Sequence, residues 1–87
     1  MASYRLVFKR SAAKELEELP AKVRPRVVER VDALAGNPRP IGCEQLSGEK
    51  KYRIRQGDYR IVYGIDDAAL IVTIVKIGHR RDVYRAA

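Results

Sequence analysis

The chain has 87 residues, the size of one small domain, so the sequence predicts a single domain over residues 1–87 with one two-layer core. Charged residues make up 33% of the chain and hydrophobic residues 46%, a balance that favours a globular domain over a disordered chain. There are 18 Lys and Arg against 11 Asp and Glu, and the resulting net charge of +7 indicates a polyanionic or acidic partner.

Cysteine and histidine each occur once, as Cys43 and His79, which excludes a disulfide framework and a Cys/His zinc site. The longest apolar segment, residues 68–77, is far shorter than the roughly 20 residues of a membrane-spanning helix. The first ten residues lack the apolar stretch of a secretory signal peptide. We therefore expect a soluble, cytoplasmic protein with no membrane partner.

The first half of the chain predicts one strand and two helices. Residues 4–8 are a short β-prone segment, and Ser11 is the expected N-cap of a helix that Pro20 ends. A second helix is expected over residues 21–35, where valines and a leucine form one apolar stripe. Pro25 is tolerated there because the first turn of a helix has no intrahelical N–H bonds to lose.

The second half predicts a loop over residues 39–50 and then three strands over residues 51–56, 59–65 and 70–77. The element order β-α-α-β-β-β predicts an α+β fold in which a helical hairpin packs on one face of a small, mostly antiparallel sheet. The last strand is apolar on both faces, so we expect it to be central.

A two-residue turn at Gly57-Asp58 predicts the register of the hairpin, because Gly at the first central position is typical of a type II′ turn. In this register Arg55 lies opposite Arg60, and alternation places Arg53 on the same side. We call this cluster of three residues the arginine face. The opposite side carries the residues expected under the helices, namely Tyr52, Ile54, Tyr59, Ile61 and Tyr63.

Two arginines directly opposite each other repel, at a cost of a few tenths of a kcal/mol to about 1 kcal/mol. Exposed strands do carry arginine for solubility alone, and the other interpretation is a binding site for phosphate or another anion. We favour the anion site.

The C-terminal segment adds further candidates. Gly78 breaks the last strand, and His79, Arg80 and Arg81 follow directly, with Tyr84 a few residues later. The side on which His79 falls depends on the preceding turn, because an even number of loop residues places it on the arginine face and an odd number does not. As a lone histidine it is either an ordinary surface residue or a catalytic base, and Tyr84 is either an aromatic plug or a ligand contact.

Two segments resemble the RelE/ParE superfamily of bacterial toxin–antitoxin toxins, and the likeness covers nearly the whole chain. The segments are YRIRQGDYRIVY at residues 52–63 and IGHRRDVY at residues 77–84. RelE-like members cleave mRNA in the ribosomal A site, whereas ParE-like members inhibit DNA gyrase. The terminal arginine and tyrosine resemble the RelE-like branch.

The resemblance implies a role for each candidate residue. Arg60 matches the arginine that holds the scissile phosphate, Arg80 matches a second arginine of that site, and Tyr84 matches the tyrosine that contacts the reacting nucleotide. His79, where other members often have Lys, completes the implied catalytic set. The implied RNA-binding residues are Lys51, Arg53, Arg55 and Arg81.

The implied reaction is attack of the RNA 2′-OH on the phosphodiester, without metal or other cofactor. The implied partners are mRNA in the ribosomal A site and a RelB-like antitoxin that is small, acidic and partly disordered. The toxin is expected to contact DNA only indirectly, through this antitoxin. Two alternatives stay open: a ParE-like gyrase inhibitor without nuclease activity, and a nucleic-acid-binding or degenerate toxin with no activity.

Overall fold

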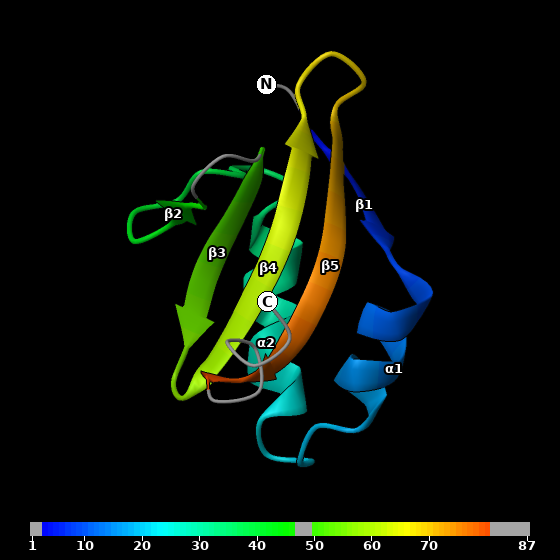
Figure 1. Ribbon diagram of the computed structural model, residues 1–87, viewed down its shortest axis with the longest axis vertical. Helices are drawn as coiled ribbons and strands as arrows, with labels where there is room; N and C mark the ends of the chain where they lie inside the picture. Colours follow the sequence, from blue (N-terminus) through cyan, green and yellow to red (C-terminus); the bar gives the residue numbers. More distant parts are fainter. Residues whose placement is uncertain (1–2, 47–49, 81–87) are drawn as a thin grey trace.

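The computed structural model describes residues 3–46 and 50–80. Two helices pack against a five-stranded mixed sheet, which confirms the predicted α+β class (Figure 1). In chain order the elements are β1 (Arg5–Phe8), α1 (Arg10–Glu17), α2 (Arg24–Ala33), β2 (Glu44–Gln45), β3 (Lys51–Gln56), β4 (Tyr59–Asp66) and β5 (Ile71–His79).

The strands lie in the order β1-β5-β4-β3-β2. The pair β1–β5 is parallel and the other three pairs are antiparallel, so the sheet is mostly antiparallel, as the sequence predicts. The apolar strand β5 is internal, with a neighbour on each side, but the middle strand is β4. The core lies between the helices and the sheet. Its buried members are Ala12, Leu19, Val27, Val31, Leu34, Ile54, Ile61, Tyr63, Ile65, Val72, Ile74 and Ile77.

The β3–β4 hairpin has the register that its turn predicts. Gln56 pairs with Tyr59, and Arg55 pairs with Arg60. Gly57 has a φ of +60°, and Asp58 is not among the described residues with positive φ, which is the sign pattern of a type II′ turn. The turn chemistry therefore fixes which side chains of β3 and β4 share a face.

A β-bulge in β5 changes the phase of that strand. Val62 pairs with Lys76 but Tyr63 pairs with Ile74, so Val75 is an extra residue. The bulge explains why the buried residues Ile74 and Ile77 are three positions apart. Every residue of β5 after Val75 consequently lies on the face opposite to the one that simple alternation from the β4–β5 turn predicts.

Three local predictions need correction. Ser11 is inside α1 and not its N-cap, which is Lys9, because the Lys9 N–H still bonds to Ile74 of β5 while the Lys9 carbonyl already accepts the helical bond from Ala13. The helix expected over residues 21–35 is the shorter α2. The loop expected over residues 39–50 contains β2, whose Glu44 pairs with Arg53, and a two-residue strand is too short to show alternation.

Helix α1 also covers the edge of β5 where β1 has ended. The last paired residue of β1 is Phe8, so the backbone of β5 beyond Ile74 needs another partner. Glu15 provides it, because one carboxylate oxygen accepts from the Ile77 N–H at 3.0 Å and the other from Lys76 Nζ at 2.7 Å. This contact holds the C-terminal end of β5 in place beside the candidate site.

Candidate functional site

The arginine face forms on the side of β3 and β4 that points away from the helices. Arg55 and Arg60 are directly opposite each other, and Arg53 alternates with Arg55 on β3. Lys51 falls on the same side by the same alternation. The structure therefore brings together four of the basic residues that the sequence predicts for the site.

Arg60 differs from the expected exposed arginine because it is buried, with only 6% of its surface accessible. Its Nη1 donates to the carbonyl oxygens of Gly57 and Tyr59, both at 3.3 Å. Its Nε is enclosed and has no hydrogen-bond partner, and within residues 3–46 and 50–80 it forms no ion pair. A buried charge without a counter-ion is costly, so this guanidinium is a fixed cation that favours an external anion.

The Gly57-Asp58 turn anchors two of the predicted arginines. Its Gly57 carbonyl accepts from Arg60, and its Asp58 carbonyl accepts the backbone N–H of Arg80 at 2.8 Å. The Arg80 side chain is exposed. The chain leaving β5 is thus tied to the same turn that positions Arg60. Arg81 and Tyr84 lie outside the described residues.

Glu44 on β2 is a residue that the sequence analysis missed. Its carboxylate contacts Arg53 Nη2 at 3.0 Å and lies 3.8 Å from Arg55 Nη2. It stands on the same face because Glu44 and Arg53 are cross-strand partners. No alternation or motif marks Glu44 in the sequence, and only the pairing of β2 with β3 brings it to the site.

His79 lies on the other side of the sheet from the arginine face. It pairs with Tyr59, and the two rings meet edge to face with centroids 5.6 Å apart. His79 lines a hollow of about 280 Å³ together with Glu15 of α1 and Glu18, the C-cap of that helix. The β4–β5 loop has four residues, and this even number alone would place His79 on the arginine face. The bulge at Val75 moves His79 to the opposite face. The structure therefore does not bring His79 to Arg60, whose partner on β5 is Gly78.

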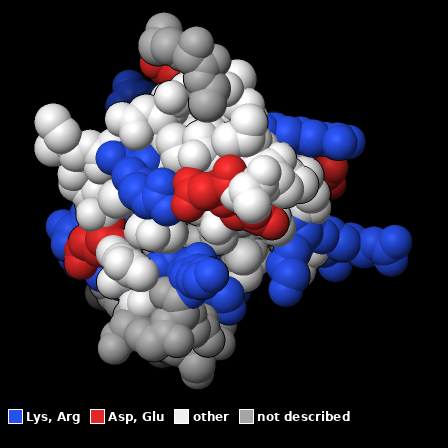
Figure 2. Space-filling model, turned by 90° about the horizontal axis from the view of Figure 1, so that it is seen from above, with Lys and Arg blue, Asp and Glu red and all other residues white. Residues whose placement is uncertain are grey.

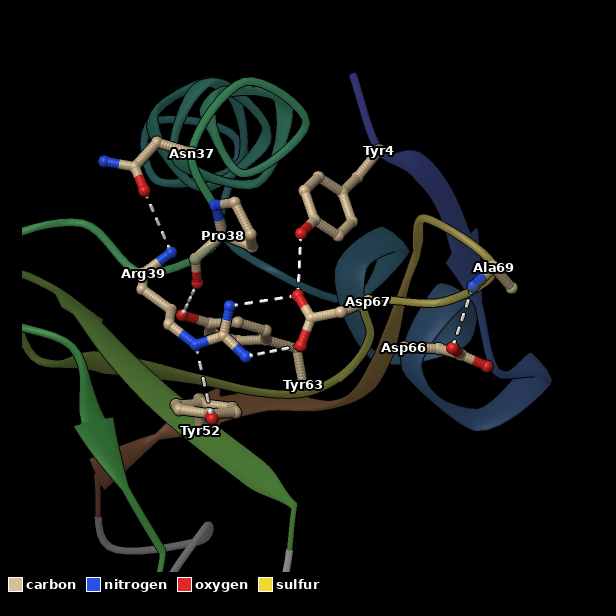
Figure 3. A network of polar contacts seen from close by, with 9 residues as sticks. All are labelled: Tyr4, Asn37, Pro38, Arg39, Tyr52, Tyr63, Asp66, Asp67 and Ala69. Atoms are coloured by element: carbon tan, nitrogen blue, oxygen red, sulfur yellow. Dashed lines mark hydrogen bonds and ion pairs between the residues drawn. The ribbon is translucent and has the colours of Figure 1, made fainter. Parts of the chain in front are cut away.

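A second polar cluster lies near the β4–β5 turn and is satisfied internally (Figure 3). Arg39 donates to both carboxylate oxygens of Asp67, at 3.1 and 2.9 Å, and Tyr4 donates to the same carboxylate at 2.7 Å. These bonds, chiefly that from Arg39, lower the pKa of Asp67 to about 2. Arg39 also lies 5.2 Å from the centre of the Tyr52 ring. The hydrogen bonds of this cluster join loops to strands, and the charges of Arg39 and Asp67 neutralise each other.

The charges at this end of the molecule are mixed in sign. Figure 2 shows acidic groups between the Lys and Arg side chains when the molecule is seen from above. The net charge of +7 is therefore not concentrated at this end of the molecule.

Among residues 3–46 and 50–80, no group of three or more His, Cys, Asp or Glu is arranged to hold a metal ion. In the same residues, no helix has the length and apolar composition needed to cross a membrane.

Comparison with known proteins identifies the family. Residues 6–84 match the family described as the ParE toxin of type II toxin–antitoxin systems. The toxin RelE of Mycobacterium tuberculosis is 37% identical over 94% of this chain and 87% of its own length. The mRNA interferase toxin RelE of Escherichia coli is 30% identical over 98% of this chain and 94% of its own length.

Solved structures agree with this match. The toxin–antitoxin complex RelBE2 from M. tuberculosis aligns with a TM-score of 0.79 at 31% identity, covering 90% of this chain and 99% of the matched one. The intact E. coli RelBE complex aligns with a TM-score of 0.78 at 28% identity, covering 88% and 96%. Because the folds agree and the matches cover most of the sequence, the chain belongs to the RelE/ParE superfamily and is a toxin of a type II toxin–antitoxin system.

Proposed function

We propose that this toxin is a ribosome-dependent endoribonuclease that cleaves mRNA in the ribosomal A site. The observation that carries the proposal is the state of Arg60, a buried guanidinium held by backbone carbonyls and without an acidic partner in the described part of the chain. Relatives that are named mRNA interferases, 30% identical over 98% of this chain, support the same activity.

The chemistry needs few groups because RNA supplies its own nucleophile, the 2′-OH. Attack on the phosphodiester gives a transition state with more negative charge on the non-bridging oxygens, and Arg60 and Arg80 stabilise that charge. A preorganised donor of this kind is worth about 3–4 kcal/mol, or a factor of about 100 to 1000 in rate. Because the backbone already orients Arg60, little reorganisation accompanies the reaction. The bond from phosphorus to the 5′-oxygen breaks, and that oxygen takes a proton from solvent and leaves as a 5′-hydroxyl. The other product ends in a 2′,3′-cyclic phosphate, and we expect no cofactor.

Proton transfer and RNA binding are assigned to the remaining candidates. Tyr84 contacts the reacting nucleotide and accepts the proton, and His79 takes no part, because its ring packs against Tyr59 on the opposite side of the sheet. The sugar-phosphate backbone of the mRNA runs over the basic side chains Lys51, Arg53, Arg55 and Arg81.

The protein partner in this proposal is a RelB-like antitoxin. Two of the solved relatives are complexes of a RelE toxin with a RelB antitoxin. A chain with a net charge of +7 suits a small acidic partner that is partly disordered when alone. We place the complex in the cytoplasm, where the ribosome positions the mRNA. DNA is contacted only through the antitoxin.

A second candidate is a ParE-like inhibitor of DNA gyrase without nuclease activity. The match of residues 6–84 to the ParE toxin family favours it. The two functions differ in target, because only the gyrase inhibitor stops supercoiling by purified gyrase.

The deciding experiment compares the wild type with Arg60→Ala and with Arg10→Ala, an exposed arginine on α1. Primer extension on mRNA from cells that express each variant should show discrete cuts within translated codons for the wild type and the control. Arg60→Ala should lose them by about 100-fold or more, with circular dichroism showing that it is folded. Cuts that persist in Arg60→Ala, or gyrase inhibition without cuts, contradict the proposal.

A further inference from the structure

Within residues 3–46 and 50–80, the carboxylate of Glu44 lies among the side chains of the arginine face. Three guanidinium groups, on Arg53, Arg55 and Arg60, stand on neighbouring strands, and Glu44 is the carboxylate that the structure pairs with two of them. Because Arg55 and Arg60 are cross-strand partners of like charge, a carboxylate near Arg55 relieves repulsion in the free protein. The same carboxylate repels any phosphate that approaches those arginines.

The two contacts of Glu44 are unequal. The contact to Arg53 is 3.0 Å long, and only 14% of the Arg53 side chain is exposed. The contact to Arg55 is 3.8 Å long, and 61% of the Arg55 side chain is exposed. Exposed and loose ion pairs contribute little to stability, so an external anion displaces the second contact more easily than the first.

We propose that Glu44 is an intramolecular counter-ion that competes with an RNA phosphate for Arg55. This inference rests on the proposed function, because that function names RNA as the ligand. Binding of RNA breaks the Arg55–Glu44 contact, while Arg53 stays with Glu44 and orients it. Glu44 thereby weakens RNA binding by the free toxin, and the basic residues on β3 contribute unequally: Arg55 contributes more to RNA binding than Arg53, which also holds Glu44.

The test measures binding of a single-stranded RNA oligonucleotide, blocked at its 2′ positions against cleavage, by fluorescence anisotropy over a series of salt concentrations. Glu44→Gln keeps an oxygen for Arg53 but removes the charge. It should bind about threefold to tenfold more tightly at low salt, the effect of one carboxylate near a phosphate. The slope of log K against log salt should steepen by about 0.7, the value for one more phosphate contact on a single strand.

The matched control is Glu29→Gln, which makes the same change of charge at an exposed position of α2. It should change RNA affinity by less than about twofold, because exposed charges far from the ligand are screened by salt. Equal tightening in both variants would reduce the effect to net charge and overturn the inference. Unchanged or weaker RNA binding by Glu44→Gln also overturns the inference. The inference fails as well if none of the variants binds the RNA. Glu44→Ser provides a second neutral variant if the first does not fold.

A further pair of variants tests the division of roles on β3. Arg55→Gln should weaken RNA binding more than Arg53→Gln, and equal losses would contradict the assignment. These readouts are independent of cleavage. If the wild type makes no cuts in mRNA while Glu44→Gln still binds RNA more tightly than Glu29→Gln, the proposed function fails and the role of Glu44 stands.

Discussion

Tyr63 offers the sharpest test of how the core supports the site. Its side chain is fully buried, and its hydroxyl donates to the Pro38 carbonyl at 2.7 Å, joining β4 to the loop after α2. Burial raises the pKa of this phenol, so it stays a neutral donor. Tyr63→Phe keeps the ring in place but removes the donor and leaves the buried Pro38 carbonyl without it. The lost hydrogen bond and the desolvation penalty of the unpaired carbonyl together predict a loss of about 1–2 kcal/mol in the free energy of unfolding.

The assay is urea unfolding followed by circular dichroism, with a thermal scan alongside. For a domain of this size, a loss of that order lowers the melting temperature by about 5–10 °C. Tyr52→Phe is the matched control, because the Tyr52 ring stacks on Tyr63 with centroids 5.9 Å apart while its hydroxyl accepts only a 3.4 Å bond from Arg39 in an exposed position. It should cost less than about 0.5 kcal/mol. Equal losses in the two variants, or none in Tyr63→Phe, would refute the reasoning.

Two further predictions concern the turns. The pKa of Asp67 is lowered to about 2, mainly by Arg39, so its contribution to stability is complete above about pH 4, the usual value of the group, and disappears as the pH falls towards 2. Thermal unfolding of Asp67→Asn should therefore depend less on pH between 4 and 2 than the wild type, and an identical dependence would contradict this. Gly57 has a φ of +60°, so Gly57→Ala should cost about 1–2 kcal/mol of unfolding free energy. Gly36→Ala, where φ is not positive and the added carbon meets only ordinary contacts, should be nearly neutral in the same measurement.

The β3–β4 hairpin was predictable because its information is local. Gly57 at the first turn position selects the turn type, the turn type fixes the register, and the register with strict alternation decides that Arg55 and Arg60 share a face. All of these steps use residues within a few positions of one another.

The features that sequence analysis missed depend on contacts between distant segments. The bulge at Val75 is hidden because residues around it are apolar on both faces, so a shift of one position leaves the hydrophobic pattern almost unchanged. Its trace is the spacing of Ile74 and Ile77. Glu44 reaches the site only through a two-residue strand, and the burial of Arg60 is a tertiary property that no local pattern records.

The Gly57-Asp58 turn links folding to the proposed activity. The same two residues that set the hairpin register offer the carbonyls that receive Arg60 and the backbone of Arg80. A change that alters this turn therefore moves the charges of the site as well as the register of the sheet, whereas a change in Glu44 alters the charge of the site and leaves the register in place. Loss of activity together with loss of stability is expected at Gly57, and a change of RNA affinity with little loss of stability is expected at Glu44, since its ion pairs are at the surface.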